Sequence, residues 1–430
     1  MKILTDPILI PKVNEKKMDI EQIDSELYHL MEKEEQRQKS TLNLIASENY
    51  ASRATLLAQA SGFANKLAEG YVGNRYCAGC EVIDELENLA INRLKTLFKV
   101  DHANVQCPTA TQANLAVYFA LLNPGDVIIA PKLSHGGHFS HGSPRHISGK
   151  MFRFYHYGVA RETERLDFAE IRELARQKKP KLIIAGMSAY PRMFPYDEYR
   201  AIADEAGAFL LADIAHIVGL IIADLHPSPV PYADVITSST HKTFGGPRGG
   251  GLIMCTKALA GKIDDAVFPG TQGAPIMNFI ASRAVLFKQA MTTAFRQKQQ
   301  QTVENAKALA DSLKSNGLRL VTGGTDTHLI LVDLRRQNIT GSQAEALLYA
   351  VGIVTNKNRI PFDEKPATET SGLRLGSVSL TNRGMRQPEM IKIGKMVSTI
   401  LCRPNDRAVA AEVKKEVSAL TAEFPNLSME

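Results

Sequence analysis

Cysteine is scarce in this chain of 430 residues, which has only five, an odd number. A small odd set in a long chain argues against a disulfide framework and for a reducing compartment. We therefore expect a cytoplasmic protein. The close pair in Cys77-Ala78-Gly79-Cys80 has no thioredoxin-like βαβ pattern around it, so we interpret both thiols as buried or spectator groups rather than redox or zinc ligands.

Long apolar runs and dense basic runs are also missing. No stretch approaches the ~20 apolar residues that a membrane-spanning helix needs, and Met1 to Asn14 lacks the continuous apolar centre of a signal peptide. The 51 basic and 45 acidic residues give a net charge of +6 without a basic cluster. We expect neither a membrane nor a nucleic-acid partner, whereas a modest positive charge suits small phosphates and carboxylates.

Hydrophobic residues make up 44% of the chain and charged residues 22%, which is typical of a globular protein with more than one domain. Short apolar runs without polar alternation are separated by helical stretches. This pattern indicates a mostly parallel α/β sheet covered on both faces, with ligands at the carboxyl ends of the strands. The predicted strands are 126–130, 181–185, 209–212, 234–237 and 251–254.

The ends of the chain have other patterns. Residues 18–37 show helical spacing of apolar positions and predict an amphipathic arm that must bury one face. A polar helical stretch over 280–313, strands at 318–321 and 327–332 and a helix at 342–351 predict a smaller α+β domain. The predicted units are an N-terminal arm (1–60), a large cofactor domain (61–290), a small domain (291–402) and a charged helical tail (403–430).

Lys242 lies among small hydroxyl residues, in Ser238-Ser239-Thr240-His241-Lys242-Thr243, directly after a predicted apolar strand. Partial desolvation and neighbouring groups would lower the pKa of such an amine, so that its neutral form could attack an aldehyde cofactor. Pyridoxal 5′-phosphate is the obvious candidate. The segment alone leaves open a solvated lysine in a glycine-rich turn. The glycines of 245–251 are not a P-loop, because the Gly-Lys-Ser/Thr ending is absent.

Two further segments fit the same cofactor. Asp213 follows the strand 209–212, where a carboxylate can bind a protonated pyridine nitrogen; a helix cap is the alternative. Thr109, Ala110 and Thr111 precede a predicted helix over 112–122, and their hydroxyl and backbone N–H groups predict a cup for the cofactor phosphate. Simple N-capping is the alternative there.

Histidines and one arginine complete the candidate set. His135, His138 and His141 lie in a glycine-rich loop with no cysteine or carboxylate at ligand spacing, so we expect no metal and interpret His138 as stacking on the cofactor ring. Arg374 lies in a glycine-flanked predicted strand, where its guanidinium can clamp a substrate carboxylate bidentately. A structural ion pair is the alternative for Arg374.

Several ordered motifs together closely resemble the serine hydroxymethyltransferase family. The motifs are Leu44-Ile45-Ala46-Ser47-Glu48-Asn49, Ala68-Glu69-Gly70-Tyr71, the His135 loop, Ala212-Asp213-Ile214-Ala215-His216, Thr240-His241-Lys242-Thr243, Asn356-Lys357-Asn358 and Thr370-Ser371-Gly372. The resemblance runs from about Ile20 to Cys402. It implies fold type I of the pyridoxal-phosphate enzymes, which is the aspartate-aminotransferase fold, and a homodimer whose active sites each take residues from both subunits.

The resemblance also implies a role for each site residue. The cofactor would be held by Thr109, Ala110, Thr111, His138, Ser188, Asp213, His216, Ser239, Lys242, Arg248 and, from the facing subunit, Gly273. Lys242 would form the Schiff base, Arg374 would bind the amino-acid carboxylate, and Glu69 would be the acid/base at the substrate hydroxyl, with Ser47, Tyr76 and His241 also in the catalytic set. The family cleaves the Cα–Cβ bond of a β-hydroxy amino acid and passes the one-carbon unit to tetrahydrofolate.

The chain departs from the family pattern at several positions. Two tyrosines that normally line the substrate pocket are replaced by Leu67 and Cys77, and the usual Ser-Gly-Ser of the phosphate cup is Thr-Ala-Thr at 109–111. For folate, Leu133, Gly137 and Asn358 match the family, but a usual leucine is Phe139 and a usual Ser-Pro-Phe is Pro-Ala-Thr at 366–368.

These departures leave three hypotheses about function. The first is a hydroxymethyltransferase that acts on serine or a close β-hydroxy relative, with folate as co-substrate. The second is an aldolase, a transaldolase or an α-methylserine-type transferase, in which Leu67 and Cys77 make room for a larger substrate and folate is not required. The third is a catalytically silent regulatory partner, against which the intact Lys242, Asp213, Arg374 and Glu69 argue.

Overall fold

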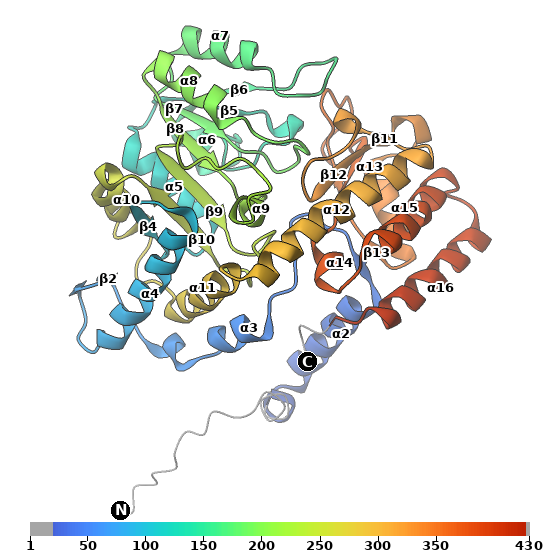
Figure 1. Cartoon of the computed structure of the whole chain (residues 1–430), viewed down its shortest axis with the longest axis horizontal. Helices are drawn as coiled ribbons and strands as arrows, with labels where there is room; N and C mark the ends of the chain where they lie inside the picture. The colour runs from blue at the N-terminus through green and yellow to red at the C-terminus, as the bar shows by residue number, and fades with distance from the viewer. Residues whose placement is uncertain (1–19, 427–430) are drawn as a thin grey trace, which may run out of the picture.

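A seven-stranded sheet forms the centre of the larger of two lobes in the computed structural model, which describes residues 20–426 (Figure 1). Only β10 runs antiparallel to its neighbours, so the prediction of a mostly parallel sheet is confirmed. In spatial order the strands are β4 (His102–Asn104), β10 (Gly251–Cys255), β9 (Val235–Ser239), β8 (Phe209–Asp213), β7 (Leu182–Ala185), β5 (Val127–Pro131) and β6 (Arg153–Tyr157).

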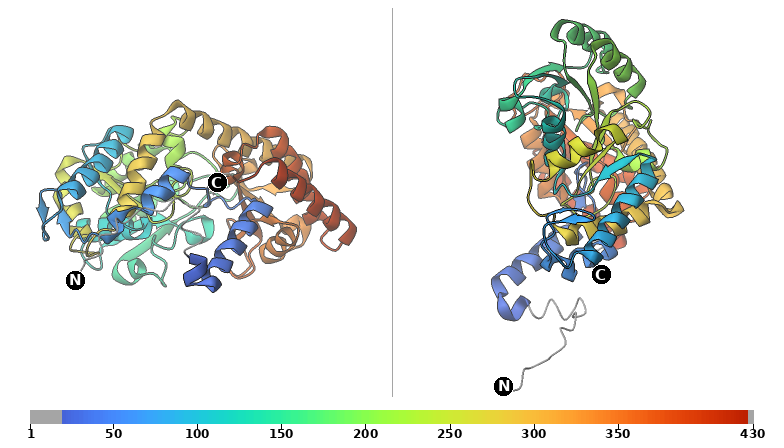
Figure 2. Two further views of the ribbon diagram at one scale, coloured as in Figure 1. Left: turned by 90° about the horizontal axis from the view of Figure 1, so that it is seen from below. Right: turned by 90° about the vertical axis from the view of Figure 1, so that its left-hand side faces the viewer.

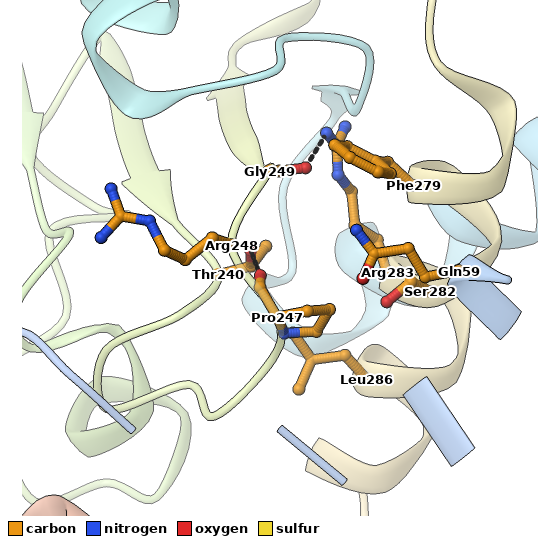
Figure 3. A pocket seen from close by; sticks show the side chains of 9 residues that line it. All are labelled: Gln59, Thr240, Pro247, Arg248, Gly249, Phe279, Ser282, Arg283 and Leu286. Carbon is orange, nitrogen blue, oxygen red and sulfur yellow. Dashed lines mark hydrogen bonds between the residues drawn. The ribbon is translucent and has the colours of Figure 1, made fainter. Parts of the chain in front are cut away.

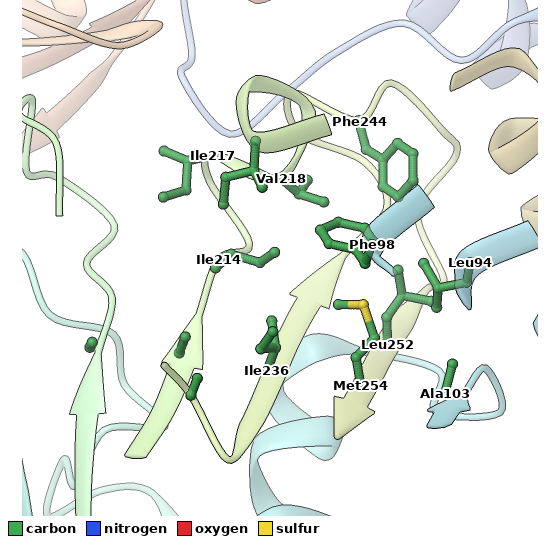
Figure 4. Close-up of a cluster of buried hydrophobic side chains, with 14 of the residues drawn as sticks. Leu94, Phe98, Ala103, Ile214, Ile217, Val218, Ile236, Phe244, Leu252 and Met254 are labelled. Carbon is green, nitrogen blue, oxygen red and sulfur yellow. The ribbon is translucent and has the colours of Figure 1, made fainter. Parts of the chain in front are cut away.

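Alternate side chains of these strands enter two different hydrophobic cores. On β9, for example, Ile236 belongs to the core shown in Figure 4, whereas Val235 belongs to the core on the opposite face. Both faces are therefore buried, which is why the strands read as continuous apolar runs. The helices of this lobe are α4 (Glu81–Phe98), α5 (Ala110–Leu121), α6 (Ile147–Met151), α7 (Phe168–Lys178), α8 (Tyr196–Ala206), α9 (Val218–Ile222) and α10 (Ala260–Val267).

The polar helical stretch predicted over 280–313 is two helices, so the expectation of a single element was wrong. Helix α11 (Met277–Ala290) ends in the larger lobe, and α12 (Thr293–Ser315) continues into the smaller one (Figure 1). The break has a local cause: Thr292 has an extended backbone, and its hydroxyl accepts a hydrogen bond from the N–H of Phe295. A threonine cap of this kind starts a new helix.

The smaller lobe is built on a four-stranded antiparallel sheet in the order β11 (Arg319–Leu320), β12 (Leu329–Asp333), β15 (Gly372–Gly376) and β14 (Asn356–Asn358). Its helices are α13 (Gly341–Ala350), α14 (Val378–Asn382), α15 (Gln387–Cys402) and α16 (Arg407–Glu423). The core of this lobe includes Val413, Val417 and Leu420 of α16. The described part of the predicted tail is therefore packed on this lobe, with α16 along its outer side (Figure 2).

The N-terminal segment also belongs to the smaller lobe. Strand β1 (Leu42–Asn43) pairs in parallel with β13 (Ile353–Val354), and Leu42 and Leu44 are buried in the same core as α16. The chain then passes through α3 (Arg53–Gln59) into the larger lobe. This segment leads directly to Ser47 and Asn49, so the start of the chain ties the two lobes together beside the candidate site. The domain boundaries given above stay a prediction.

Helix α2 (Ser25–Ser40) precedes this segment and projects from the body of the protein (Figures 1 and 2). It has no buried residue, and its apolar positions Leu27, Leu30 and Met31 are 48%, 62% and 41% exposed. The predicted arm is thus helical over its described part, but its apolar face is not covered by the rest of the described chain. Residues 1–14, on which the signal-peptide argument rests, and the end of the tail lie outside the described residues.

Candidate active site

Asp213 and the segment that carries Lys242 lie at the carboxyl ends of the neighbouring parallel strands β8 and β9. Asp213 is the last residue of β8 and faces Thr237 of β9 across the ladder. Lys242 follows three residues after the end of β9. This edge of an open α/β sheet is where ligands bind, and the structure thus brings the predicted aldehyde-binding amine and the predicted pyridine-binding carboxylate together.

Asp213 is buried and surrounded by hydrogen-bond donors. Its Oδ2 accepts from Asn114 Nδ2 at 2.9 Å and from His141 Nε2 at 3.1 Å, and its Oδ1 accepts from the N–H of Ala215 at 3.1 Å. Burial alone would raise the pKa of the carboxyl, but the hydrogen bond and charge of His141 outweigh it and hold the pKa well below its ordinary range. The site therefore keeps a buried negative charge, which can stabilise a protonated pyridine nitrogen.

The pKa of the Lys242 amine is lowered by burial, as the sequence predicted. Burial lowers the pKa of its amine to about 8, opposed by the charge of Asp213 and assisted by the charges of Arg374 and Arg248. A substantial neutral fraction therefore exists near neutral pH, as attack on an aldehyde requires. The backbone carbonyl of Lys242 accepts a hydrogen bond of 3.0 Å from Asn49 Nδ2, which fixes this segment to the N-terminal part of the chain.

His138 lies at the same edge and is held in one orientation. Its Nδ1 accepts from the N–H of Ser140 at 3.2 Å and lies 2.7 Å from the Ser140 hydroxyl. Burial, followed by the charge of His141, lowers the pKa of His138 to about 4, so the ring is neutral. A neutral, oriented imidazole can stack on a cationic aromatic ring without charge repulsion.

His216 and Ser239, also predicted to contact the cofactor, are both buried. The His216 ring stacks on His328 with centroids 5.6 Å apart, and burial holds the pKa of His216 well below its usual range, followed by the charges of Lys242 and Arg374. His328 Nε2 donates to the carbonyl of Ala46 at 3.1 Å. Ser239 is buried at the end of β9, and its hydroxyl donates to the carbonyl of Ala215 at 3.4 Å.

The residues predicted to bind the cofactor phosphate lie at the N-terminus of α5. Thr109 has an extended backbone and caps the helix through a 3.2 Å bond from the N–H of Gln112, and Ala110 and Thr111 are the first two helical residues. Their N–H groups have no partner within the helix and can bind an anion. Strand β10 passes tightly against this N-terminus, since a Cβ on Gly251 would lie 2.2 Å from the carbonyl oxygen of Thr109.

Arg374 of β15 reaches from the smaller lobe to the site. Its Nε donates to Asn356 Oδ1 at 3.2 Å, and its two terminal nitrogens donate to the carbonyl of Ser188 at 2.8 Å and the hydroxyl of Ser47 at 3.2 Å. These bonds use one N–H on each nitrogen, and a guanidinium has five N–H groups in all. One N–H is left on each terminal nitrogen, which is the arrangement that binds a carboxylate bidentately.

The guanidinium of Arg374 donates to an amide, a backbone carbonyl and a hydroxyl, none of which carries a negative charge. Burial lowers the pKa of its guanidinium to about 10. The sequence left open a structural ion pair for Arg374. These three hydrogen bonds do not form one. A buried cation with neutral partners is suited to an anionic ligand.

Glu69 and Tyr76 lie elsewhere, on a small hairpin of β2 (Gly70–Tyr71) and β3 (Asn74–Arg75) at the edge of the larger lobe (Figure 1). The N–H of Tyr76 donates to the carbonyl of Glu69 at 3.1 Å, and Tyr76 is 74% exposed. Gly273 lies beside them, because a Cβ on Gly273 would be 3.6 Å from Glu69 Oε1. Glu69 is not among the charges that shift the pKa of Lys242.

The hairpin is rigidly anchored and also presents the two departures from the family pattern. Arg75 donates to the carboxylates of Asp84 and Glu87 and to two backbone carbonyls of the hairpin. Leu67 is 56% exposed, and Cys77 is partly buried. Glu69, Tyr76, Leu67 and Cys77 thus form one fixed group at the surface of the chain.

A buried arginine of α11, Arg283, holds the loop 245–251. Arg283 donates to the carbonyl of Gly249 at 2.6 Å (Figure 3). It also donates to the carbonyl of Cys107 at 3.0 Å. Gly249 has a φ of +95°, and a Cβ there would lie 2.3 Å from the Phe279 ring, so only glycine fits. Figure 3 shows that Arg248 points away from this packed region.

His241, next to Lys242, has a buried Nδ1 without a hydrogen-bond partner among the described residues. Burial lowers the pKa of His241 to about 3, with smaller effects from Lys242 and Arg248. A buried ring nitrogen without a partner is costly in a folded protein, and it leaves a polar atom available to a bound group.

The residues assigned to folate fall on two elements. Leu133 is 43% exposed at the start of a 3₁₀ turn, and Phe139 is 58% exposed, whereas Gly137 is buried between them. Asn358 lies on β14, two positions from Asn356, which faces Arg374. The loop is joined to the arginine site through Ser188, whose N–H donates to Gly136 and whose carbonyl accepts from Arg374.

The histidines of the loop 135–141 and the cysteines are the side chains that a metal or redox site would use. Within residues 20–426 no cluster of histidine, cysteine, aspartate or glutamate is suited to a metal ion. His135 accepts from the N–H of Val159, His138 bonds Ser140 and His141 bonds Asp213, so the three histidines have separate partners. All five cysteines are free thiols. Each helix of the described chain is too short or too polar to cross a bilayer.

Comparison with known proteins agrees with this geometry. A family model described as "Serine hydroxymethyltransferase" matches residues 20–397. A protein named serine hydroxymethyltransferase from Methanosarcina barkeri is 51% identical over 406 residues, covering 94% of this chain and 98% of its own length. A protein of the same name from a Nostoc species is 51% identical over 402 residues, covering 94% of each chain.

The chain belongs to the serine hydroxymethyltransferase family. It therefore has the fold-type I architecture, uses pyridoxal phosphate with tetrahydrofolate as co-substrate, and is a pyridoxal-phosphate-dependent hydroxymethyltransferase of amino-acid and one-carbon metabolism. The expectations of family, fold, activity and cofactors are confirmed. Three features at the edge of the larger sheet fit this cofactor. The carboxylate of Asp213 suits its ring nitrogen, the Lys242 amine with its lowered pKa suits its aldehyde, and the N-terminus of α5 suits its phosphate.

When bound, pyridoxal phosphate supplies an electron-accepting ring that stabilises negative charge at the amino-acid Cα. The chain's own residues supply the rest. Asp213 would hold the protonated ring nitrogen, His138 would cover one face of the ring, and Lys242 would provide the amine that holds the aldehyde. Arg374 would hold the substrate carboxylate, and an acid/base such as Glu69 would move the proton of the substrate hydroxyl.

Three residues that hold this site were missed by the sequence argument. Asn114 and His141 donate to Asp213, and Asn356 accepts from Arg374. His141 had a detectable signal, since it lies three residues after His138 in the same loop. Asn114 had only its place on the first turns of α5, where it also accepts from Thr237 at 2.6 Å and so ties α5 to β9.

Proposed function

We propose that Lys242 is the lysine that holds the cofactor aldehyde, that Asp213 binds the ring nitrogen and that Arg374 binds the carboxylate of serine. One observation carries this proposal: burial lowers the pKa of the Lys242 amine to about 8, and the same amine is influenced by the charges of Asp213, an ionised carboxylate, and of Arg374, a guanidinium that has two N–H groups left for a carboxylate. The phosphate is assigned to Thr109, Ala110 and Thr111, and the ring contacts to His138, Ser188, His216 and Ser239, with Arg248 and His241 nearby.

Borohydride reduction followed by peptide mapping tests the assignment of the lysine. The reduced cofactor should be found on Lys242, and Lys242→Ala should carry none. Lys257 is an exposed lysine that follows β10 in the chain. Lys257→Ala is the matched control and should label as fully as the wild type. Labelling of another lysine in the wild-type protein would refute the assignment.

We also propose that the active unit is a homodimer with shared sites. Two features support it: the apolar face of α2 is exposed, and Glu69, Tyr76 and Gly273 form one group at the edge of the chain. In a dimer this group would enter the partner's site, with Gly273 at the phosphate and Glu69 at the substrate hydroxyl. Leu133, Gly137, Phe139 and Asn358 are the proposed folate contacts.

Mixing two inactive variants tests the shared site. Glu69→Gln should retain the cofactor but slow hydroxymethyl transfer by roughly 10²–10⁴-fold, the usual effect of losing an acid/base. Lys242→Ala should be inactive for a different reason. Together they should recover activity, because a mixed dimer has one intact site. No recovery after subunit exchange has been demonstrated by mass spectrometry would show that each site is made by one chain.

The proposed location is the cytoplasm, and the proposed substrate is serine. The free state of all five cysteines supports a reducing compartment. Fractionation of cells with an antibody to the protein tests the location. A larger β-hydroxy or α-methyl amino acid is the second candidate substrate. The replacement of two pocket tyrosines by Leu67 and Cys77 favours it, and steady-state kinetics with serine and α-methylserine test it.

A further inference from the structure

His328 lies where three distant segments of the chain meet. It directly precedes β12 in the smaller lobe. Its Nε2 donates to the carbonyl of Ala46 in the N-terminal segment at 3.1 Å. Its ring stacks on His216, which follows β8 in the larger lobe, with ring planes 22° apart. His328 is completely buried, and it is not one of the residues that the sequence predicted for the site.

The hydrogen bond to Ala46 fixes the proton of the His328 ring. A carbonyl oxygen can only accept, so Nε2 carries the proton and Nδ1 carries the lone pair. Burial lowers the pKa of His328 to about 3, opposed by the bond to Ala46 and assisted by the charges of Arg374 and Lys242. The ring is therefore neutral near neutral pH, and it lies within electrostatic reach of both predicted cations of the site.

Packing alone does not explain an imidazole at this position. Nδ1 of His328 is buried and has no hydrogen-bond partner among the described residues, which is costly in a folded protein. An apolar ring of similar size would fill the space without this cost. His216 Nδ1 is 3.5 Å from His328 Nε2, which is too long for a normal hydrogen bond. The bond from Nε2 to Ala46 is therefore the contact that requires a histidine.

The carbonyl of Ala46 belongs to the peptide group that leads into Ser47. The Ser47 hydroxyl accepts a hydrogen bond of 3.2 Å from Arg374. Within the described part of the chain, His328 is the one hydrogen-bond partner of the Ala46 carbonyl, and the N–H of Ser47 has none. His328 thus orients the peptide from which the Ser47 side chain reaches Arg374.

The strand that carries Arg374 is packed against the same segment. The N–H of Gly376, on β15, donates to the carbonyl of Leu44 at 2.8 Å. A Cβ on Gly376 would lie 2.5 Å from the Cα of Ala46, so the two backbones are in close contact. Leu329, the neighbour of His328 in the chain, faces Gly376 across the sheet. A change at His328 therefore has only a short, tightly packed path to Arg374.

We propose that His328 is a positioning residue of the active site, which acts through two separate contacts. Its Nε2–H orients Ala46 and Ser47, and through them it sets the guanidinium of Arg374 for the substrate carboxylate. Its ring face holds His216 at the cofactor. This inference rests on the roles proposed for Arg374 and His216. Small displacements of a group that positions a substrate have large effects on its use.

Three replacements of His328 separate the two contacts. His328→Phe keeps an aromatic ring beside His216 but has no donor, whereas His328→Gln keeps an N–H donor but has no ring. His328→Leu is a second variant without a donor, so the comparison does not depend on the folding of one protein. Glycine titration of the holoenzyme, at saturating cofactor and followed by the cofactor absorbance, measures the contact with Ala46. Equilibrium dialysis of the cofactor measures the contact with His216.

The two affinities should respond differently to these replacements. Glycine should bind about tenfold more weakly to His328→Phe and His328→Leu, because the Ala46 carbonyl loses its donor, and with near wild-type affinity to His328→Gln. Cofactor affinity should fall about threefold or more in His328→Gln and His328→Leu, where the stacked ring is lost, and stay unchanged in His328→Phe. Equal losses in His328→Phe and His328→Gln, or wild-type glycine affinity in His328→Phe, would overturn the proposal.

A double-mutant cycle with Ser47→Ala tests the path to Arg374. Once the Ser47 hydroxyl is removed, His328→Phe should cost little further glycine affinity, and fully additive losses would refute the path. His226→Phe is the matched control, because His226 is also buried and neutral but packs against Phe194 and Tyr196. His226→Phe should lower the melting temperature without changing either affinity.

The proposed function and this inference fail in different ways. If Arg374→Lys leaves glycine affinity unchanged, the assignment of Arg374 is wrong. If Arg374→Lys weakens glycine binding and His328→Phe does not, the assignment of Arg374 stands and the role inferred for His328 is wrong.

Discussion

Replacing Arg374 by lysine tests the geometry of the substrate site most directly. In the structure, the guanidinium bonds Asn356, Ser188 and Ser47 with three of its five N–H groups and has two left for a carboxylate. A lysine ammonium has only three N–H groups in total. Each bond that it makes to the substrate therefore leaves one of these three buried partners without a donor.

The expected loss of affinity follows from this count. A buried group left unsatisfied costs about 1–3 kcal/mol, and two carboxylate bonds would leave two such groups. We therefore expect Arg374→Lys to weaken binding by about 2–6 kcal/mol, or roughly 30- to 25,000-fold in Kd. The charge is retained, so the loss reports geometry rather than net electrostatic attraction.

Glycine titration followed by the absorbance of the bound cofactor measures this affinity. The cofactor should remain bound in Arg374→Lys, since Asp213 and Lys242 are unchanged. Arg335→Lys is the matched control, because Arg335 lies in the same lobe but is an exposed partner of Asp333. Glycine affinity within twofold of the wild type in Arg374→Lys, with the cofactor spectrum intact, would refute the assignment of Arg374 to the carboxylate.

Three further predictions follow from the same site. His141→Phe removes a donor from Asp213 Oδ2, so cofactor affinity should fall about tenfold or more in equilibrium dialysis; an unchanged affinity would show that His141 is not needed to hold the charge of Asp213. In the cofactor-free protein, the pKa of Lys242 is lowered from 10.5 to about 8 on folding, so between these values the unfolded state binds more protons and the free energy of unfolding should rise with pH. Urea titrations of wild type and Lys242→Met should differ in this window, with the rise absent from the variant. Leu67→Tyr with Cys77→Tyr should shift steady-state preference from α-methylserine towards serine, since each methylene accommodated is worth about 1–3 kcal/mol; wild type that turns over serine with tetrahydrofolate efficiently and ignores α-methylserine would contradict the enlarged pocket.

The sequence by itself determined the parts that depend on local pattern. Continuous apolar runs such as 182–185 predicted buried parallel strands, because a strand covered on both faces has no polar side to alternate with. Asp213 and Lys242 could be found for the same reason: each follows such a strand, and the carboxyl ends of parallel strands meet at one edge. The family motifs then supplied the roles that this placement alone left open.

Other features depended on contacts between distant parts of the chain. The break between α11 and α12 at Thr292 was missed, because in a sequence a threonine that caps a helix cannot be told from any other polar residue of a helical stretch. The supports of Asp213 come from residues 99 and 72 positions away, Asn114 and His141. No periodicity encodes such pairs.

The pKa of Lys242 and the two N–H groups left on Arg374 were likewise decided only by the tertiary structure. Burial and hydrogen-bond partners are properties of the packed chain. A sequence names the groups that carry the chemistry, but their protonation and their remaining bonding capacity are set by what folding places around them.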